Sequence, residues 1–146
     1  MQNVYVKIAT ALVALLLLAG CSSGSGKYRD NNMSITEFER NIGDRVFFAL
    51  DSTTLSDQAK TTLDAQAKWL TEHDRFNITV EGHCDERGTR EYNIALGERR
   101  AEAVRAYLVS MGLNASRLET ISYGKERPAV IGNDEAAWGQ NRRAVT

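Results

Sequence analysis

The sequence predicts an α/β sandwich, in which helices pack on one face of a small mixed β-sheet. Stretches with the two-residue period of strands alternate with stretches that have the period of helices. The 146 residues leave room for one compact domain and an accessory segment. The single proline, Pro128, lies outside the predicted strands and helices. The order strand, helix, strand, helix, strand is typical of such a layered fold.

The first half of the predicted domain consists of a strand, a helix and a second strand. Residues 45–50 form a short β-prone run. An amphipathic stretch follows over residues 56–73, and Asp57 near its start suits the positive end of a helix dipole. The apolar side chains of this stretch recur at helical spacing, at Ala59, Leu63, Ala67 and Leu70. Residues 76–81 alternate apolar and polar side chains, which predicts a half-buried strand that ends at Gly82.

The second half continues with a helix, a strand and two short elements. A helix is predicted over about residues 92–111, with Gly112 as its stop signal. Its inner stripe consists of Ala101, Val104 and Leu108. Residues 120–123 are predicted to form a third strand. Residues 136–140 are expected to form a helical turn, and residues 142–146 a last strand.

The N-terminal residues 1–20 have the pattern of an export signal. Lys7 and no acidic residue precede an apolar run over residues 11–18, and the apolar character ends at Gly20. A membrane-spanning helix needs roughly 20 apolar residues, so this run is too short to be one. A buried core helix would leave the polar residues that follow unexplained. The pattern therefore predicts a cleaved signal peptide.

The junction Leu18-Ala19-Gly20-Cys21 resembles the bacterial lipobox, in which the cysteine is acylated and becomes the mature N-terminus. This resemblance implies a covalent lipid on Cys21, with ordinary secretion as the alternative. Two or more acyl chains anchor a protein stably to a membrane. Ser22 after the cysteine fits sorting to the outer membrane. Residues 21–33 are polar and rich in Ser and Gly, which predicts a lipidated flexible tether before a domain over residues 34–146.

The charge pattern gives no reason to expect binding to nucleic acid. The formal net charge is −1 and the sequence pI is about 6.1. Acidic residues interleave with the arginines of the second predicted helix, which is typical of a solvated, ion-paired helix face.

The cysteines and histidines favour neither a metal site nor an enzyme. Acylation of Cys21 would leave Cys84 without an intramolecular disulfide partner, so Cys84 is expected to be a small buried thiol. Residues 83–86 include metal-binding side-chain types, but four consecutive residues cannot all converge on one ion. A hydrolase with Cys84 as nucleophile would need His73 or His83 as its base. Neighbouring side chains of a strand point to opposite faces, which argues against His83 in that role. Apart from the lipid, no cofactor is expected.

The segment GHCDERGTREYN at residues 82–93 places Asp85 just after a predicted strand. On the next helix, spacing puts Asn93 and Arg100 on one stripe. A carboxylate and a guanidinium that share one pocket suit a zwitterionic ligand, because the carboxylate accepts from an ammonium and the guanidinium grips a carboxylate. An Asp85–Arg100 salt bridge that merely closes the turn is the alternative.

Residues 45–146 closely resemble the OmpA-like domain family, and most specifically its peptidoglycan-associated lipoproteins. Besides residues 82–101, the resemblance rests on SYGKERPAV at residues 122–130, DEAA at 134–137 and NRRAV at 141–145. It implies a non-enzymatic protein of the Tol-Pal system in the outer membrane. Such a protein would face the periplasm, bind peptidoglycan without a covalent bond and act at cell constriction. TolB would be a second partner that competes for an overlapping surface.

The resemblance also implies a set of site residues. Asp85 would bind the amino group and Arg100 a carboxylate of the diaminopimelate in the peptidoglycan stem peptide. Asn93 would shape the pocket. Two residues would line its floor, namely Gly82 and His83. The loop from Phe48 to Asp51 would form the opposite wall through backbone donors.

Three features depart from the family pattern. In the loop after the first strand, Ala49 and Leu50 replace an acidic or small residue and an aromatic one. Cys84 stands where a small or hydroxyl residue is more usual. The sequence stops at Thr146, a few residues early, so we expect a short last strand or a truncated sequence.

Overall fold

The computed structural model describes residues 34–146, so the predicted signal peptide, Cys21 and the predicted tether lie outside the described residues. The elements in chain order are η1 (Phe38–Ile42), β1 (Arg45–Phe47), α3 (Asp57–Glu72), β2 (Ile78–His83), α4 (Arg90–Ser110), η2 (Ala115–Arg117), β3 (Leu118–Gly124), α5 (Glu135–Asn141) and β4 (Arg143–Val145). In this part of the chain no helix combines the length and the apolar character that crossing a membrane requires.

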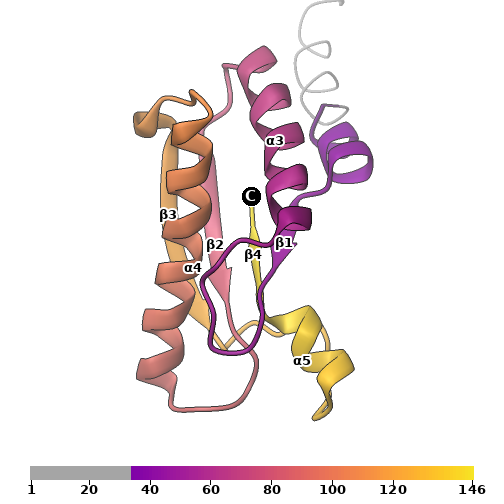
Figure 1. Cartoon of the computed structure of the whole chain (residues 1–146), viewed down its shortest axis with the longest axis vertical. Helices are drawn as coiled ribbons and strands as arrows, with labels where there is room; N and C mark the ends of the chain where they lie inside the picture. Colours follow the sequence, from indigo (N-terminus) through magenta and orange to yellow (C-terminus); the bar gives the residue numbers. More distant parts are fainter. Residues whose placement is uncertain (1–33) are drawn as a thin grey trace, which may run out of the picture. The chain divides into compact units, whose positions relative to one another are not determined.

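The four strands form one mixed sheet in the order β1-β4-β2-β3. The last strand, β4, pairs antiparallel with β1 on one side and with β2 on the other, and Ala144 is the partner of both Val46 and Gly82. On the far side of β2, β3 runs parallel to it. Figure 1 shows β4 between β1 and β2. The mixed sheet that the sequence predicted is therefore confirmed.

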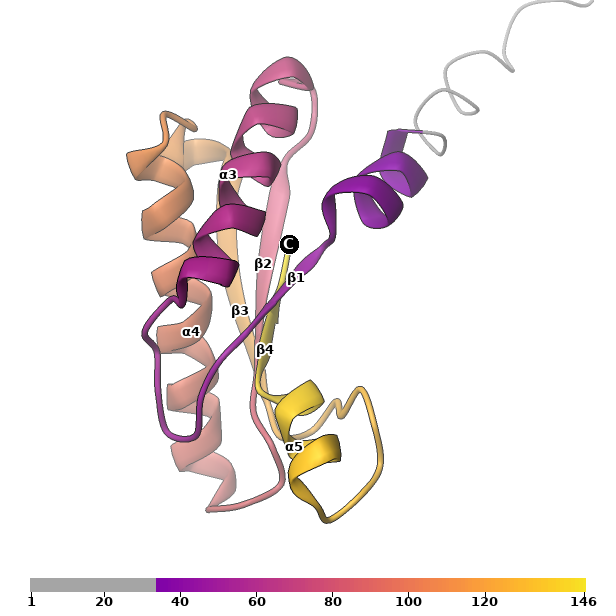
Figure 2. The ribbon, with the colours of Figure 1, turned by 45° about the vertical axis from the view of Figure 1, so that its right-hand side comes forward.

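Helices α3 and α4 cover one face of the sheet, as both views show (Figures 1 and 2). Their predicted apolar stripes are buried in one core with the sheet, and the most deeply buried members are Leu63, Val80, Ala101, Val104 and Leu108. Each helix starts at a capping side chain. Ser56 accepts a hydrogen bond from the Ala59 N–H, and Thr89 accepts one from the Tyr92 N–H. The predicted sandwich with helices on one face is confirmed.

The structure differs from the sequence prediction at β1. This strand ends at Phe47, whereas the β-prone run extends to residue 50. The chain turns away from the sheet there because the carbonyls of Ala49 and Ser52 accept hydrogen bonds from Arg100. Tertiary contacts thus override the local strand preference.

Two further differences lie at the opposite end of the core. Phe76 is outside β2, and its ring stacks 5.7 Å from Trp69 instead of extending the strand. The turn η1 was not predicted as an element. Its Phe38 is buried, and the centres of the Phe38 and Trp69 rings lie 5.0 Å apart. Both differences follow from aromatic packing around one tryptophan, which strand and helix periods do not reveal.

Helix α4 lies unusually close to β2 because glycines meet where the two elements touch. A β-carbon on Gly82 would stand 1.8 Å from the carbonyl oxygen of Gly97, which no folded protein tolerates. A β-carbon on Gly97 would likewise approach the Ser122 hydroxyl to 2.3 Å. This close contact fixes the start of α4, with Asn93 and Arg100, against the end of β2.

Candidate ligand-binding site

A cavity of about 280 Å³ opens beyond the end of β2. It lies between the β2–α4 loop, the first turns of α4 and the β1–α3 loop, and Arg142 just before β4 also reaches it. The lining residues are Leu50, Asp51, Cys84, Asp85, Arg87, Gly88, Tyr92, Asn93, Leu96, Arg100 and Arg142. Four of the residues that the sequence singled out are therefore gathered here, namely Asp51, Asp85, Asn93 and Arg100.

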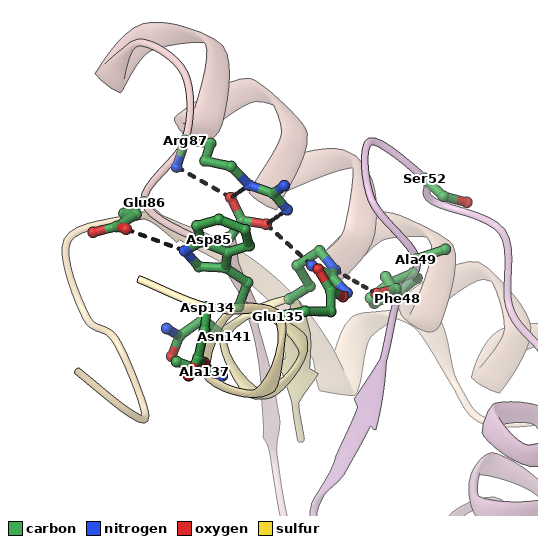
Figure 3. Close-up of polar contacts among 12 residues, drawn as sticks. Phe48, Ala49, Ser52, Asp85, Glu86, Arg87, Asp134, Glu135, Ala137 and Asn141 are labelled. Atoms are coloured by element: carbon green, nitrogen blue, oxygen red, sulfur yellow. Dashed lines mark hydrogen bonds and ion pairs between the residues drawn. The ribbon is translucent and has the colours of Figure 1, made fainter. Parts of the chain in front are cut away.

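Asp85 is buried, and two arginines hold its carboxylate (Figure 3). Oδ2 accepts from Arg87 Nη2 at 2.7 Å and from Arg142 Nη1 at 3.3 Å. Oδ1 accepts from the side chain and the backbone N–H of Arg87, at 3.2 and 3.1 Å. Burial would raise the pKa of Asp85, but the hydrogen bonds from Arg87 and Arg142 outweigh it, and the pKa lies below its ordinary value. The carboxylate is therefore charged at neutral pH.

This lowered pKa predicts how the stability of the protein depends on pH. Ionised Asp85 stabilises the fold above the unfolded-state pKa of about 3.9, and that stabilisation is lost as the pH falls through the lower folded-state pKa. Urea unfolding should therefore give a stability difference between wild type and Asp85→Asn that is largest near pH 7. The difference should shrink as the pH falls below about 4. A difference that stays constant down to pH 3 would contradict this account of Asp85.

Arg100 is fully buried, and backbone carbonyls hold its guanidinium. Nε donates to Ser52 at 2.9 Å, Nη1 to His83 at 2.9 Å and Nη2 to Ala49 at 3.2 Å. Each terminal nitrogen of a guanidinium carries two N–H groups, so Nη1 and Nη2 each keep one further donor. Burial lowers the pKa of Arg100, yet arginine remains protonated in proteins. The group is a rigid cation that lines the cavity, and the Cys84 side chain is a further hydrogen-bonding neighbour of it.

Asp85 and Arg100 line the same cavity, but the ion pairs of Asp85 go to Arg87 and Arg142. The alternative that the sequence left open, a salt bridge between Asp85 and Arg100, is not what holds these side chains. Each is fixed by its own partners.

Asn93 holds the loop that carries Asp85. Its side-chain amide donates to the carbonyls of Arg87 at 2.8 Å and Thr89 at 3.0 Å. The Cys84 thiol, also buried, donates to the Asn93 carbonyl at 3.3 Å, and burial raises the pKa of Cys84. The buried thiol packs between the loop and the helix.

Three of the residues that the family resemblance implied are not among those that line the cavity: Gly82, His83 and Phe48. His83 is buried, its ring lies 5.5 Å from Tyr123, and burial lowers its pKa. It supports the site through its carbonyl, which accepts from Arg100. Phe48 likewise supports the site without lining the cavity, because its ring contacts the Arg100 guanidinium at 5.2 Å.

The β1–α3 loop forms one wall of the cavity. Asp51 lies in it with a φ of 51°, and its carboxylate accepts a hydrogen bond from the Tyr92 hydroxyl. Leu50 and Tyr92 are 59% and 43% exposed, so they give the cavity an apolar rim. The carbonyls of this loop accept from Arg100, whereas the resemblance implied backbone donors that face a ligand.

The sequence prediction missed two arginines, Arg87 and Arg142. The Arg142 side chain is 8% exposed and is held on three sides, by the Phe48 carbonyl at 3.0 Å, by Asp85 and by Glu135 of α5. This last contact lowers the pKa of Glu135. The motif NRRAV contained the signal for Arg142, although a motif alone does not show which arginine faces a site 57 residues upstream. Among residues 34–146, no three His, Cys, Asp or Glu side chains gather in a way that could hold a metal ion.

Comparison with known proteins agrees with this geometry. Residues 47–142 match the OmpA family. The chain is 51% identical to a peptidoglycan-associated lipoprotein of Mesorhizobium japonicum, over 95% of this chain and 89% of that protein. It is 42% identical to one of Haemophilus influenzae, over 99% and 98%. The crystal structure of the peptidoglycan-associated lipoprotein from Burkholderia pseudomallei superimposes with a TM-score of 0.70 and 43% identity, covering 73% of this chain and 92% of that one. The chain therefore belongs to the OmpA family and, within it, to the peptidoglycan-associated lipoproteins.

Proposed function

We propose that this protein is a non-enzymatic outer-membrane lipoprotein that binds peptidoglycan without a covalent bond and so links the membrane to the cell wall. Relatives at about half sequence identity over nearly the whole chain carry this association in their names. The cavity beyond β2 supplies the chemistry that such binding requires.

The observation that carries the proposal is a buried carboxylate and a buried guanidinium that line one open cavity. Asp85 can accept from an ammonium, and the guanidinium of Arg100 can bind a carboxylate. A free amino-acid centre carries both groups at once. The diaminopimelate of the stem peptide ends in such a centre, and we assign it as the ligand.

The anchor in this proposal is a lipid on Cys21, which becomes the mature N-terminus once the signal peptide, residues 1–20, is removed. The 13 residues of the tether, 21–33, could span at most ~45 Å at ~3.5 Å per residue, which gives the domain reach toward the wall. Many anchored copies face a polymer with repeated sites, so effective concentration strengthens a modest single-site affinity.

We further propose membership of the Tol-Pal system, with TolB as a second partner and cell constriction as the setting. Family membership supports this partner, and exposed Leu50 and Tyr92 at the cavity rim offer apolar contact area. A pair of variants that separate TolB capture from sedimentation with sacculi would divide the two activities.

Sedimentation of the full-length protein, in detergent, with purified sacculi tests the proposal. The substitution Asp85→Asn removes the charge with little change of shape, and it should reduce the bound fraction about tenfold or more, because charge-assisted hydrogen bonds contribute about 1.5–3 kcal/mol. Asp57→Asn, on a fully exposed side chain at the start of α3, is the matched control and should bind like wild type. Free meso-diaminopimelic acid should release the wild-type protein. Equal binding by wild type and Asp85→Asn would refute the site.

A further inference from the structure

In the structure without ligand, an arginine of the protein already occupies the position on the Asp85 carboxylate that the proposed function gives to the ammonium of the ligand. The Arg87 guanidinium makes two side-chain bonds to Asp85, one to each oxygen, so it fills the place that an incoming ammonium needs (Figure 3). Arg142 takes a further position on Oδ2. Ligand binding at Asp85 therefore requires that one of these guanidinium groups leave.

Arg87 is the group that can move. Its side chain is 35% exposed, and Gly88, the next residue, has a φ of 93° that favours glycine. Arg142, in contrast, is buried and tied to a backbone carbonyl and to Glu135 as well as to Asp85.

Other contacts can hold the Arg87 guanidinium after it has left Asp85. Its guanidinium carbon lies 4.0 Å from the centre of the Trp138 ring, within cation–π distance. The Trp138 ring is itself fixed, because its indole N–H donates to the Glu86 carboxylate at 3.1 Å. The carboxylates of Glu86 and Glu135 add favourable charge around Arg87. The ring and the two carboxylates can keep the displaced cation close to the site.

We propose that Arg87 is a specificity-determining residue, an internal competitor that covers Asp85 in the free protein and is displaced by the ammonium of the ligand. An ammonium replaces the lost hydrogen bonds with its own three N–H donors. A ligand that carries carboxylates but no amine cannot do so, and it reaches Arg100 alone. The pocket thus distinguishes zwitterions from plain anions by requiring an exchange of cations.

This inference rests on the proposed function, and removal of the competitor tests it. In titrations of the full-length protein followed by NMR, Arg87→Ala should bind meso-diaminopimelic acid about three- to tenfold more tightly than wild type, since the ligand no longer displaces a partly exposed ion pair. Pimelic acid, the same dicarboxylate without amines, should bind equally or more weakly, because a nearby positive charge has been lost. The substitution should therefore strengthen binding of meso-diaminopimelic acid without strengthening binding of pimelic acid.

Arg90→Ala is the matched control. It removes the same charge three residues away, but Arg90 is exposed, pairs with Glu126 at 3.2 Å and does not line the cavity, so both affinities should stay at their wild-type values. Arg87→Lys should give a smaller gain for meso-diaminopimelic acid, since its ammonium still competes for Asp85 but lacks the planar fork with which Arg87 bonds to both oxygens. In wild type, meso-diaminopimelic acid should shift the Arg87 Nε signal and pimelic acid should leave it in place.

The outcomes separate the two proposals. A wild-type protein that binds neither sacculi nor meso-diaminopimelic acid overturns the proposed function and this inference with it. A wild-type protein that binds meso-diaminopimelic acid, while Arg87→Ala binds it equally or more weakly, overturns the inference alone. In that case Arg87 contacts the ligand or merely shapes the loop.

Discussion

Substitution of Arg100 by alanine should abolish binding to sacculi and lower the free energy of unfolding by about 3–5 kcal/mol. The guanidinium joins the end of β2 to the β1–α3 loop through the carbonyls of His83, Ala49 and Ser52. Each carbonyl that loses its donor in the interior costs about 1–3 kcal/mol, less whatever water can recover. The site and the fold therefore depend on the same side chain.

The measurement pairs urea unfolding with sacculus sedimentation at a temperature where circular dichroism shows native helix content. Arg99→Ala is the matched control, because it removes the neighbouring arginine on the exposed side of α4. That variant should keep both the stability and the binding of wild type. An Arg100→Ala protein as stable as wild type would show that the three carbonyls do not need their donor.

Gly82→Ala should destabilise the fold by about 3 kcal/mol, although it adds a single methyl group. The new β-carbon would meet the carbonyl oxygen of Gly97 at 1.8 Å, and both partners are backbone, so α4 has to move away from β2. Because α4 carries Asn93 and Arg100, the movement also opens the site. We therefore expect weaker binding to sacculi even at temperatures where the variant is folded.

Thermal and urea unfolding check this prediction, with Gly139→Ala as the control. Gly139 lies within α5, and a β-carbon there would have ordinary contact at 3.7 Å with Arg142. The control should be neutral or gain up to about 1 kcal/mol from helix propensity. Equal stability of Gly82→Ala and wild type would mean that the two backbones can separate without cost.

Periodicity in the sequence predicted the elements that form the main layers. The stripe from Ala59 to Leu70 and the alternation up to Val80 place these side chains in the core, where the structure has them. Shorter features depended on contacts that no local pattern contains. The early end of β1 results from Arg100, which lies about fifty residues further along the chain. The turn η1 is held by packing of Phe38 on Trp69.

The candidate site could be predicted only in part, because some of its contacts are likewise absent from any local pattern. Asp85 follows a strand and Arg100 lies on the next helix, so local spacing and family resemblance were enough to bring them to one cavity. The partners that fix Asp85 were not predictable in this way. Arg142 arrives from the end of the chain, and Arg87 is one of several arginines in a charged segment. Neither contact with Asp85 follows from local spacing in the sequence.

The inner position of β4 determines when this domain can fold. Strands β1 and β2 have no partner between them until residues 143–145 have been synthesised, and Arg142 reaches Asp85 at the same moment. A chain that is still emerging from a ribosome or a translocation channel therefore has neither a finished sheet nor a finished pocket. For an exported protein this delay is useful, because a polypeptide that folds only after its last residues have emerged stays unfolded while it crosses the channel.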